Sequence, residues 1–156
     1  MLLAAGGCGF RLRGTAEVPF QSVHVPGATS GIALDLKRNI RAGTNARVVD
    51  DPKEADAVVQ FTEETRQKEI LSLTGTGRVR EFQLRYRVGF RVHDGKGGEF
   101  VAPSTIELAR DVTFNDAEIL AKEQEEQLLF RDMQADMVQQ IMRRLAAAKR
   151  PQPRVE

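Results

Sequence analysis

The chain has 156 residues, of which 41% are hydrophobic and 29% are charged, a composition typical of one folded domain and not of a disordered chain. A formal net charge of +1 argues against a protein that coats nucleic acid through its overall field. The single cysteine excludes a disulfide framework and a cysteine-rich zinc site, and no segment approaches the roughly 20 apolar residues of a membrane-spanning helix.

The chain begins with a short apolar stub, several small residues and its only cysteine, Cys8. This order is typical of the end of a bacterial lipoprotein signal, where the cysteine after the cleavage site receives lipid. No charged segment precedes it, and residues 2–5 are fewer than the roughly 7–15 apolar residues of such a signal. We predict that residues 1–7 are a remnant of the signal, that Cys8 carries the lipid and that residues 8–19 form a tether. The alternative is a flexible N-terminus with an incidental cysteine.

Short elements come first in the predicted domain. Alternation of apolar and polar residues predicts a strand over 20–25 and another over 46–49. Between them, Thr29 or Ser30 is suited to cap a helix, and Gly43 occupies the position of a left-handed C-terminal cap. The helix carries apolar residues at helical spacing, namely Ile32, Ala33, Leu36 and Ile40.

Longer strands follow. A strand that begins near Ala57 contains a polar segment over 63–69, where we expect a twist or bulge, and ends at a turn over 74–77. The clearest strand covers 78–92 and has one buried and one solvated face. A hairpin tip over 94–98 leads to a return strand in which Arg110 shares the register of the apolar residues. The inward positions are Phe82, Leu84, Tyr86, Val88, Phe90 and Val92, then Ile106, Leu108, Val112 and Phe114.

A last helix begins at Asn115 or Asp116 and extends to about Ala147. Its apolar stripe consists of Leu129, Phe130, Met133, Met137, Ile141 and Leu145. The first half of this helix has few large apolar residues, so we expect it to bend or project, and residues 148–156 to be disordered. Residues 20–147 are therefore predicted to form one α+β domain. We expect a two-layer sandwich in which a mixed, mostly antiparallel sheet of about four strands carries two α-helices on one face.

The sequence offers no constellation of groups for catalysis. His24 and His93 have no partner at metal-ligand spacing, and no glycine-rich phosphate loop precedes a helix. We predict no enzyme activity, no catalytic or metal-binding residue and no cofactor.

Five arginines fall in or beside the clearest strand. Alternate strand residues point the same way, so Arg85 and Arg87 lie about 7 Å apart on one face. Guanidinium groups bind phosphate in a bidentate manner, and the row therefore suits a phosphorylated ligand. The alternative is a solvated sheet face that is simply charged, with Glu63, Glu64 and Glu81 as partners. The five are Arg78, Arg80, Arg85, Arg87 and Arg91.

In combination, these segments resemble the LptE family, outer-membrane lipoproteins that work with the β-barrel LptD in lipopolysaccharide assembly. Residues 8–14 (CGFRLRG) resemble the mature N-terminus of the family, and 81–84 (EFQL) with the alternating continuation resemble its central strand. Residues 106–115, followed by 121–123 (AKE) and the amphipathic helix, resemble its C-terminal half.

The resemblance implies a lipid anchor on Cys8 at the periplasmic face of the outer membrane. It also implies insertion as a plug in LptD and contact with lipopolysaccharide, without nucleic acid. The family's basic helix position matches Arg131. Its hairpin position falls at Gly75, which is not basic, and Arg78 or Arg80 is a candidate substitute for it.

Two alternatives remain. One is a periplasmic scaffold lipoprotein that docks protein subunits and binds no lipid. The other is a small hydrolase, against which the missing nucleophile–base pair argues.

Overall fold

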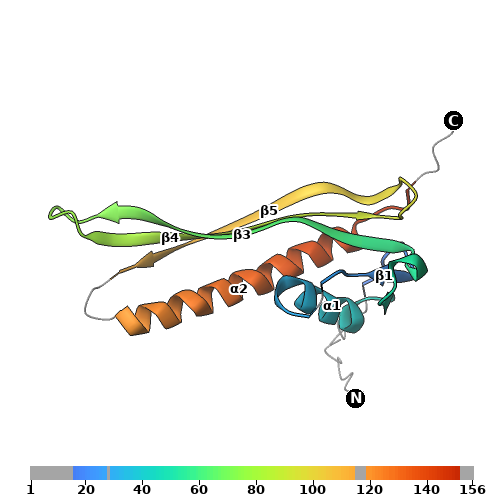
Figure 1. Ribbon diagram of the computed structural model, residues 1–156, viewed down its shortest axis with the longest axis horizontal. Helices are drawn as coiled ribbons and strands as arrows, with labels where there is room; N and C mark the ends of the chain where they lie inside the picture. The colour runs from blue at the N-terminus through green and yellow to red at the C-terminus, as the bar shows by residue number, and fades with distance from the viewer. Residues whose placement is uncertain (1–15, 28, 115–118, 152–156) are drawn as a thin grey trace, which may run out of the picture.

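Three long antiparallel strands form most of the sheet in the computed structural model, which describes residues 16–27, 29–114 and 119–151 (Figure 1). They are β3 (Ala57–Leu73), β4 (Val79–His93) and β5 (Glu99–Thr113), and β4 pairs with β3 on one side and with β5 on the other. This ribbon is the longest feature of the molecule, and the β3–β4 turn lies at its far end.

Two short parallel strands complete the sheet. β1 (Ser22–His24) lies between β2 (Arg47–Val49) and the first residues of β3, so the order is β2-β1-β3-β4-β5. The sheet thus has five strands where we expected about four, because both three-residue segments find a pairing edge. Asp56 holds β1 in place, since its carboxylate accepts hydrogen bonds from the backbone N–H groups of Gln21 and Ser22. The α+β class, the mixed sheet and the two helices are confirmed.

Both helices, α1 (Gly31–Gly43) and α2 (Ile119–Ala146), lie on the same side of the sheet (Figure 1). A 3₁₀ turn, η1 (Pro52–Glu54), links β2 to β3. The face of β4 that meets the helices is the predicted apolar one, and Leu84, Tyr86 and Phe90 on it are fully buried. The other face of the ribbon carries no helix and is called here the outer face.

The end of α1 differs from the prediction. Gly43 is the last helical residue and does not adopt a positive φ. Thr44 ends the helix in an extended conformation, and both its backbone N–H and its hydroxyl donate to the carbonyl of Ile40. The threonine therefore satisfies a terminal carbonyl, and no left-handed glycine is required.

β3 shifts register on either side of its polar segment and keeps a continuous register over 63–69, where we expected the twist or bulge. The register with β4 shifts between Phe61 and Glu63, directly opposite Gly89. A Cβ atom on Gly89 would lie 2.6 Å from Oγ1 of Thr62 and 3.3 Å from Cβ of Glu63. The bulge therefore favours glycine at this point of β4, because a side chain there would displace Thr62 or Glu63 on the partner strand.

Burial divides the molecule into two halves. The distal half comprises residues 64–88, 106–114 and 119–132, including the β3–β4 turn; the proximal half comprises the other described residues. In the proximal half, α1, β1 and the second half of α2 bury Leu36, Val23 and Ile141 completely. In the distal half, no residue of 64–73 or 119–132 is buried. In the distal half, only β4 and β5 contribute buried residues, such as Leu84 and Tyr86, so the core thins toward the β3–β4 turn.

The first and last described segments of the chain both lie in the proximal half. Val18 is buried and its N–H donates to the side chain of Asn45. Nε of Arg150, in the segment where we expected a disordered tail, donates to the carbonyl of Pro19. Cys8 and residues 152–156 lie outside the described residues.

Candidate functional site

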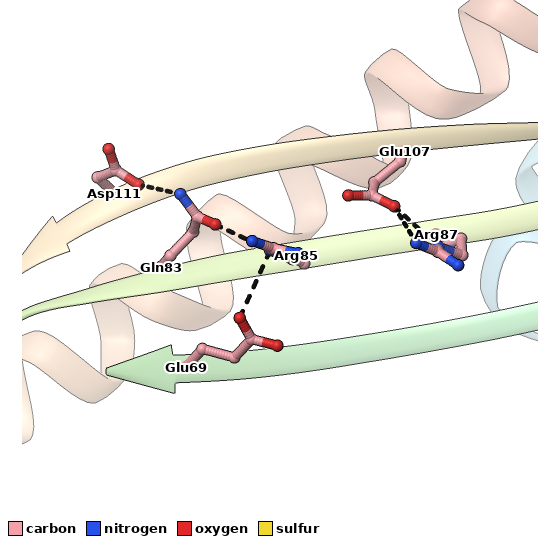
Figure 2. A network of polar contacts seen from close by, with 6 residues as sticks. All are labelled: Glu69, Gln83, Arg85, Arg87, Glu107 and Asp111. Carbon is pink, nitrogen blue, oxygen red and sulfur yellow. Dashed lines mark hydrogen bonds and ion pairs between the residues drawn. The ribbon is translucent and has the colours of Figure 1, made fainter. Parts of the chain in front are cut away.

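Three of the predicted arginines lie in a row on the outer face, where each meets a carboxylate, and Figure 2 shows two of them, Arg85 and Arg87. Nε of Arg85 donates to Gln83 and lies 3.6 Å from Glu69. Arg87 donates two hydrogen bonds to one carboxylate oxygen of Glu107, and these bonds raise the pKa of its guanidinium. The outer face is thus a ladder of acid–base pairs that runs across β3, β4 and β5.

Arg91, the third arginine of the row, is also paired with a carboxylate. Arg91 donates to the side chain of Gln60 and lies 3.7 Å from Glu99. The structure favours a solvated face of paired charges over a free cationic row. The ion-pair partners are Glu69, Glu107 and Glu99, and of the three acids expected only Glu63 acts on the row, where its charge adds to the rise in the pKa of Arg87. Glu81 accepts from Ser72, and Glu64 lies on the helix side. Arg85, Arg87 and Arg91 therefore remain predicted ligand residues only for a ligand that displaces their carboxylates.

The other predicted cations lie elsewhere in the distal half and are exposed. Arg78 and Arg80 are next to the β3–β4 turn, which also contains Gly75. Arg131 lies on α2, where Nε donates to the carbonyl of Gln127, and within the described chain it forms no ion pair. The structure thus does not bring the six predicted arginines together, because three line the outer face and three lie near the turn or on α2.

Sequence reasoning missed an apolar feature of the distal half. Among the described residues, the large hydrophobic side chains with the greatest exposure all come from the end of β3 and the first turns of α2. Leu120 is 76% exposed, Ile70 58% and Leu73 56%. The others are Leu71, Ile119 and Leu128. In α2 the signal was present in the sequence, since Ile119, Leu120 and Leu128 have no large apolar residue three or four positions away.

Cation and apolar residues meet on the exposed side of α2. Residues three, four, seven and eleven positions apart lie on one side of a helix. Arg131 therefore shares a side with Leu128, one turn earlier, and with Leu120, three turns earlier. This stripe combines a guanidinium without a carboxylate partner and exposed aliphatic chains, which is the chemistry that suits an anionic amphiphile.

Three further basic residues connect the sheet to α2 and were not predicted as site residues. Arg66 lies over the ring of Tyr86 and donates to Gln134 at 2.5 Å. Arg110 reaches Asp136 at 3.1 Å, which explains a charge in an apolar register. Lys68 pairs with Glu126 at 2.5 Å. These contacts lie on the helix side of the ribbon and hold α2 against it.

Tyr86 is the buried titratable group of this interface. It is fully buried, and its hydroxyl donates to Glu64 at 2.7 Å. Burial is the main cause that raises the pKa of Tyr86, and Glu64 adds to the effect while Arg66 opposes it. The phenol therefore stays protonated and bridges β3 and β4 below the helix layer.

Both histidine rings form hydrogen bonds with backbone groups. A ring nitrogen of His24 lies 3.2 Å from the carbonyl of Val49, and Nδ1 of His93 accepts from the N–H of Gly95. His93 borders an open depression of about 650 Å³ between η1 and the β4–β5 turn, which is also lined by Lys53 and Lys96. Across residues 16–27, 29–114 and 119–151, no group of three or more His, Cys, Asp or Glu residues is arranged to hold a metal ion.

No helix in the part of the chain that the structure describes is long and apolar enough to cross a membrane.

The sequence and the fold both match a known protein family. Residues 17–145 match the family model described as LptE, lipopolysaccharide-assembly. The LPS-assembly lipoprotein LptE of Yersinia enterocolitica is 30% identical over 152 residues, covering 92% of this chain and 70% of that protein. The protein of the same name from Photorhabdus laumondii is 26% identical over 147 residues, covering 92% of this chain and 80% of that protein.

Solved structures agree with the sequence comparisons. The solution structure of the uncharacterized lipoprotein B from Nitrosomonas europaea superposes with a TM-score of 0.76 at 44% identity, over 89% of this chain and 91% of that one. The crystal structure of the rare lipoprotein B from Shewanella oneidensis gives a TM-score of 0.67 at 26% identity, over 84% of this chain and 94% of that one. The resemblance noted in the sequence and the absence of an enzymatic role are thereby confirmed. The chain belongs to the LptE family of lipopolysaccharide-assembly lipoproteins.

Proposed function

We propose that this protein is an outer-membrane lipoprotein that binds lipopolysaccharide through its distal half and plugs the LptD β-barrel. In this proposal Cys8 carries the lipid anchor, and the protein faces the periplasm. The family supports a role in lipopolysaccharide assembly. The observation that carries the ligand proposal is the stripe on α2, where Arg131 lies beside exposed Leu128 and Leu120.

The distal half suits lipopolysaccharide because that ligand has both phosphates and acyl chains. A guanidinium without a carboxylate partner binds phosphate without first giving up an ion pair. Arg131 meets this condition, whereas Arg87 is already paired with Glu107. The exposed aliphatic side chains at the same end provide apolar surface for acyl chains.

The test is a charge-reversal triple variant, Arg78→Glu, Arg80→Glu and Arg131→Glu, measured for binding of purified lipopolysaccharide. We expect at least a tenfold weaker affinity, since three cations become anions near the ligand phosphates. A matched control reverses three exposed arginines of the proximal half, Arg38, Arg47 and Arg143. It makes the same change in net charge and should bind nearly as well as the parent protein. Equal affinities of a folded triple variant and the parent would exclude the proposal.

The anchor is tested separately, by expression from the complete gene and mass spectrometry of the mature protein. We expect the lipid mass on Cys8, and a free thiol there would contradict the anchor.

A scaffold that docks protein subunits without lipid is the second candidate, and the self-neutralised outer face favours it, since a polar face of paired charges suits a protein partner. Co-purification distinguishes the two. Only the first requires a large, heat-modifiable barrel and lipopolysaccharide in the same fraction.

A further inference from the structure

The two halves of α2 are attached to the sheet in different ways. Residues 133–146 contribute Met133, Met137 and Ile141 to the core, and all three are fully buried. Residues 119–132 contribute no buried side chain, and only Leu129 and Phe130 pack partly against the core. The second half is therefore held by apolar burial, whereas the first half depends mainly on polar contacts.

The boundary between these halves is marked on both sides of the helix. Arg66 on β3 reaches Gln134, and Arg110 on β5 reaches Asp136. These ties fall within one turn of Met133, the first fully buried residue of α2. The helix is thus fixed to both neighbouring strands at the point where its burial begins.

Beyond this point, a single ion pair between described residues connects the first half of α2 to the ribbon. Nζ of Lys68 lies 2.5 Å from Oε2 of Glu126, and the side chains are 37% and 25% exposed. The same ammonium lies 4.4 Å from the ring centroid of Phe82. The other polar contact in this half, from Lys122 to Thr113, has the long distance of 3.5 Å. Glu126 therefore occupies the ammonium of Lys68 on the helix side of the ribbon.

Apolar groups lie around this ion pair. Phe82 packs edge-to-face with Phe114 at 5.3 Å between ring centroids, and both rings are only half-buried. Ile70, opposite Phe82 on β3, is 58% exposed. A cation above an aromatic floor and beside an exposed aliphatic chain forms a site for a phosphate and an acyl chain together. The protein's own carboxylate, Glu126, now occupies the anion position.

We propose that the Lys68–Glu126 pair is a latch, and that residues 119–132 of α2 open to admit a phosphorylated amphiphile. The phosphate replaces the carboxylate of Glu126 on Lys68, and acyl chains cover Ile70, Phe82 and Phe114. The ligand class rests on the proposed function. The latch itself does not, since it follows from burial and charge.

Backbone amide hydrogen exchange of the full-length protein, freed of bound lipid, tests the latch. In Glu126→Gln, we expect exchange of residues 119–132 to accelerate about two- to fivefold, the change in an equilibrium that an exposed ion pair produces. Residues 133–146 should not change. Glu123→Gln is the matched control, because Glu123 is an exposed acid one turn earlier that forms no ion pair within the described chain. The reversed pair, Lys68→Glu with Glu126→Lys, should return exchange to the parent rate.

Binding of purified lipopolysaccharide tests the ligand. Glu126→Gln should bind about two- to fivefold more tightly than Glu123→Gln, because more of the protein is open. Lys68→Gln also opens the helix but lacks the cation, so it should exchange faster and bind more weakly than the parent.

The two measurements distinguish a failure of the latch from a failure of the ligand proposal. Equal exchange in Glu126→Gln and Glu123→Gln would overturn the latch whatever the affinity. Faster exchange without tighter binding would overturn the replacement of Glu126 by phosphate. Parent protein that does not bind lipopolysaccharide would overturn the proposed function and the ligand, and leave the exchange result as the measure of the latch.

Discussion

The proximal and distal halves use the same kinds of residues for different purposes. In the proximal half, aliphatic side chains such as Leu36 and Ile141 are fully buried between the helices and the sheet. In the distal half, Leu120 and Leu128 are exposed on a helix that has no buried residue before Met133. Apolar surface that folding leaves exposed is available to a ligand or partner.

The charged residues differ in the same way. On the outer face, acids neutralise arginines within the sheet, and Figure 2 shows this for Arg85 and Arg87. On α2, Arg131 is left without a carboxylate within the described chain. The neighbours of an arginine, more than the strand or helix that carries it, therefore decide whether its guanidinium is available for a phosphate.

The largest expected effect is on stability, from a substitution in the core. Phe90→Ala removes a fully buried ring from β4 and should lower the free energy of unfolding by about 3–5 kcal/mol. Leu128→Ala, on the exposed stripe, should change it by about 0.5 kcal/mol or less. Urea unfolding followed by circular dichroism measures both. If the two substitutions lowered the free energy of unfolding by similar amounts, the distinction between a buried proximal half and an exposed distal half would be wrong.

A smaller loss is expected at the bulge that separates the halves. In Gly89→Ala, the new methyl group meets Thr62 and Glu63, and such overpacking should cost about 1–3 kcal/mol. Adding Thr62→Ala removes the nearest atom and should restore part of the loss. Gly75→Ala is the control, because its Cβ would meet nothing within 4 Å. Unfolding by urea again gives the comparison, and a loss in Gly75→Ala equal to that in Gly89→Ala would argue against the steric explanation.

The buried phenol predicts a dependence on alkaline pH. Folding raises the pKa of Tyr86, chiefly through burial, so the folded state holds this proton more tightly than the unfolded state does. The stabilisation is complete below the unfolded pKa of about 10 and is lost as pH rises above it. The parent should therefore lose more stability between pH 8 and pH 11 than Tyr86→Phe does. Parallel curves for the two proteins would show that Tyr86 does not titrate with unfolding.

Periodicity in the sequence was sufficient for most of the fold. The alternation in β4 correctly predicted which residues face the helices, since burial on one face demands a strict period of two. It was not sufficient for the end of α1, where the side chain of Thr44 accomplishes what Gly43 was expected to do. A hydroxyl that turns back to a carbonyl leaves no periodic signal.

The candidate site was only partly predictable for a related reason. Strand alternation places Arg85 and Arg87 on one face, but which acids lie beside them depends on the register of β3 and β5. Glu69 lies 16 positions before Arg85 and Glu107 lies 20 positions after Arg87, and strand pairing fixes where these acids lie. The latch residues Lys68 and Glu126 are 58 positions apart, and no local pattern connects them.

The smallest expected effect is that of Arg85→Ala on the outer face. The variant loses the contacts with Glu69 and Gln83, and it should lower the free energy of unfolding by about 0.2–1 kcal/mol, because both partners are well exposed. Its affinity for lipopolysaccharide should equal that of the parent, whereas Arg131→Ala should weaken binding without a comparable change in stability. Urea unfolding and a binding titration on the two variants separate these roles. If Arg85→Ala weakened binding as much as Arg131→Ala, the ligand would have to displace Glu69, and the outer face would become part of the site.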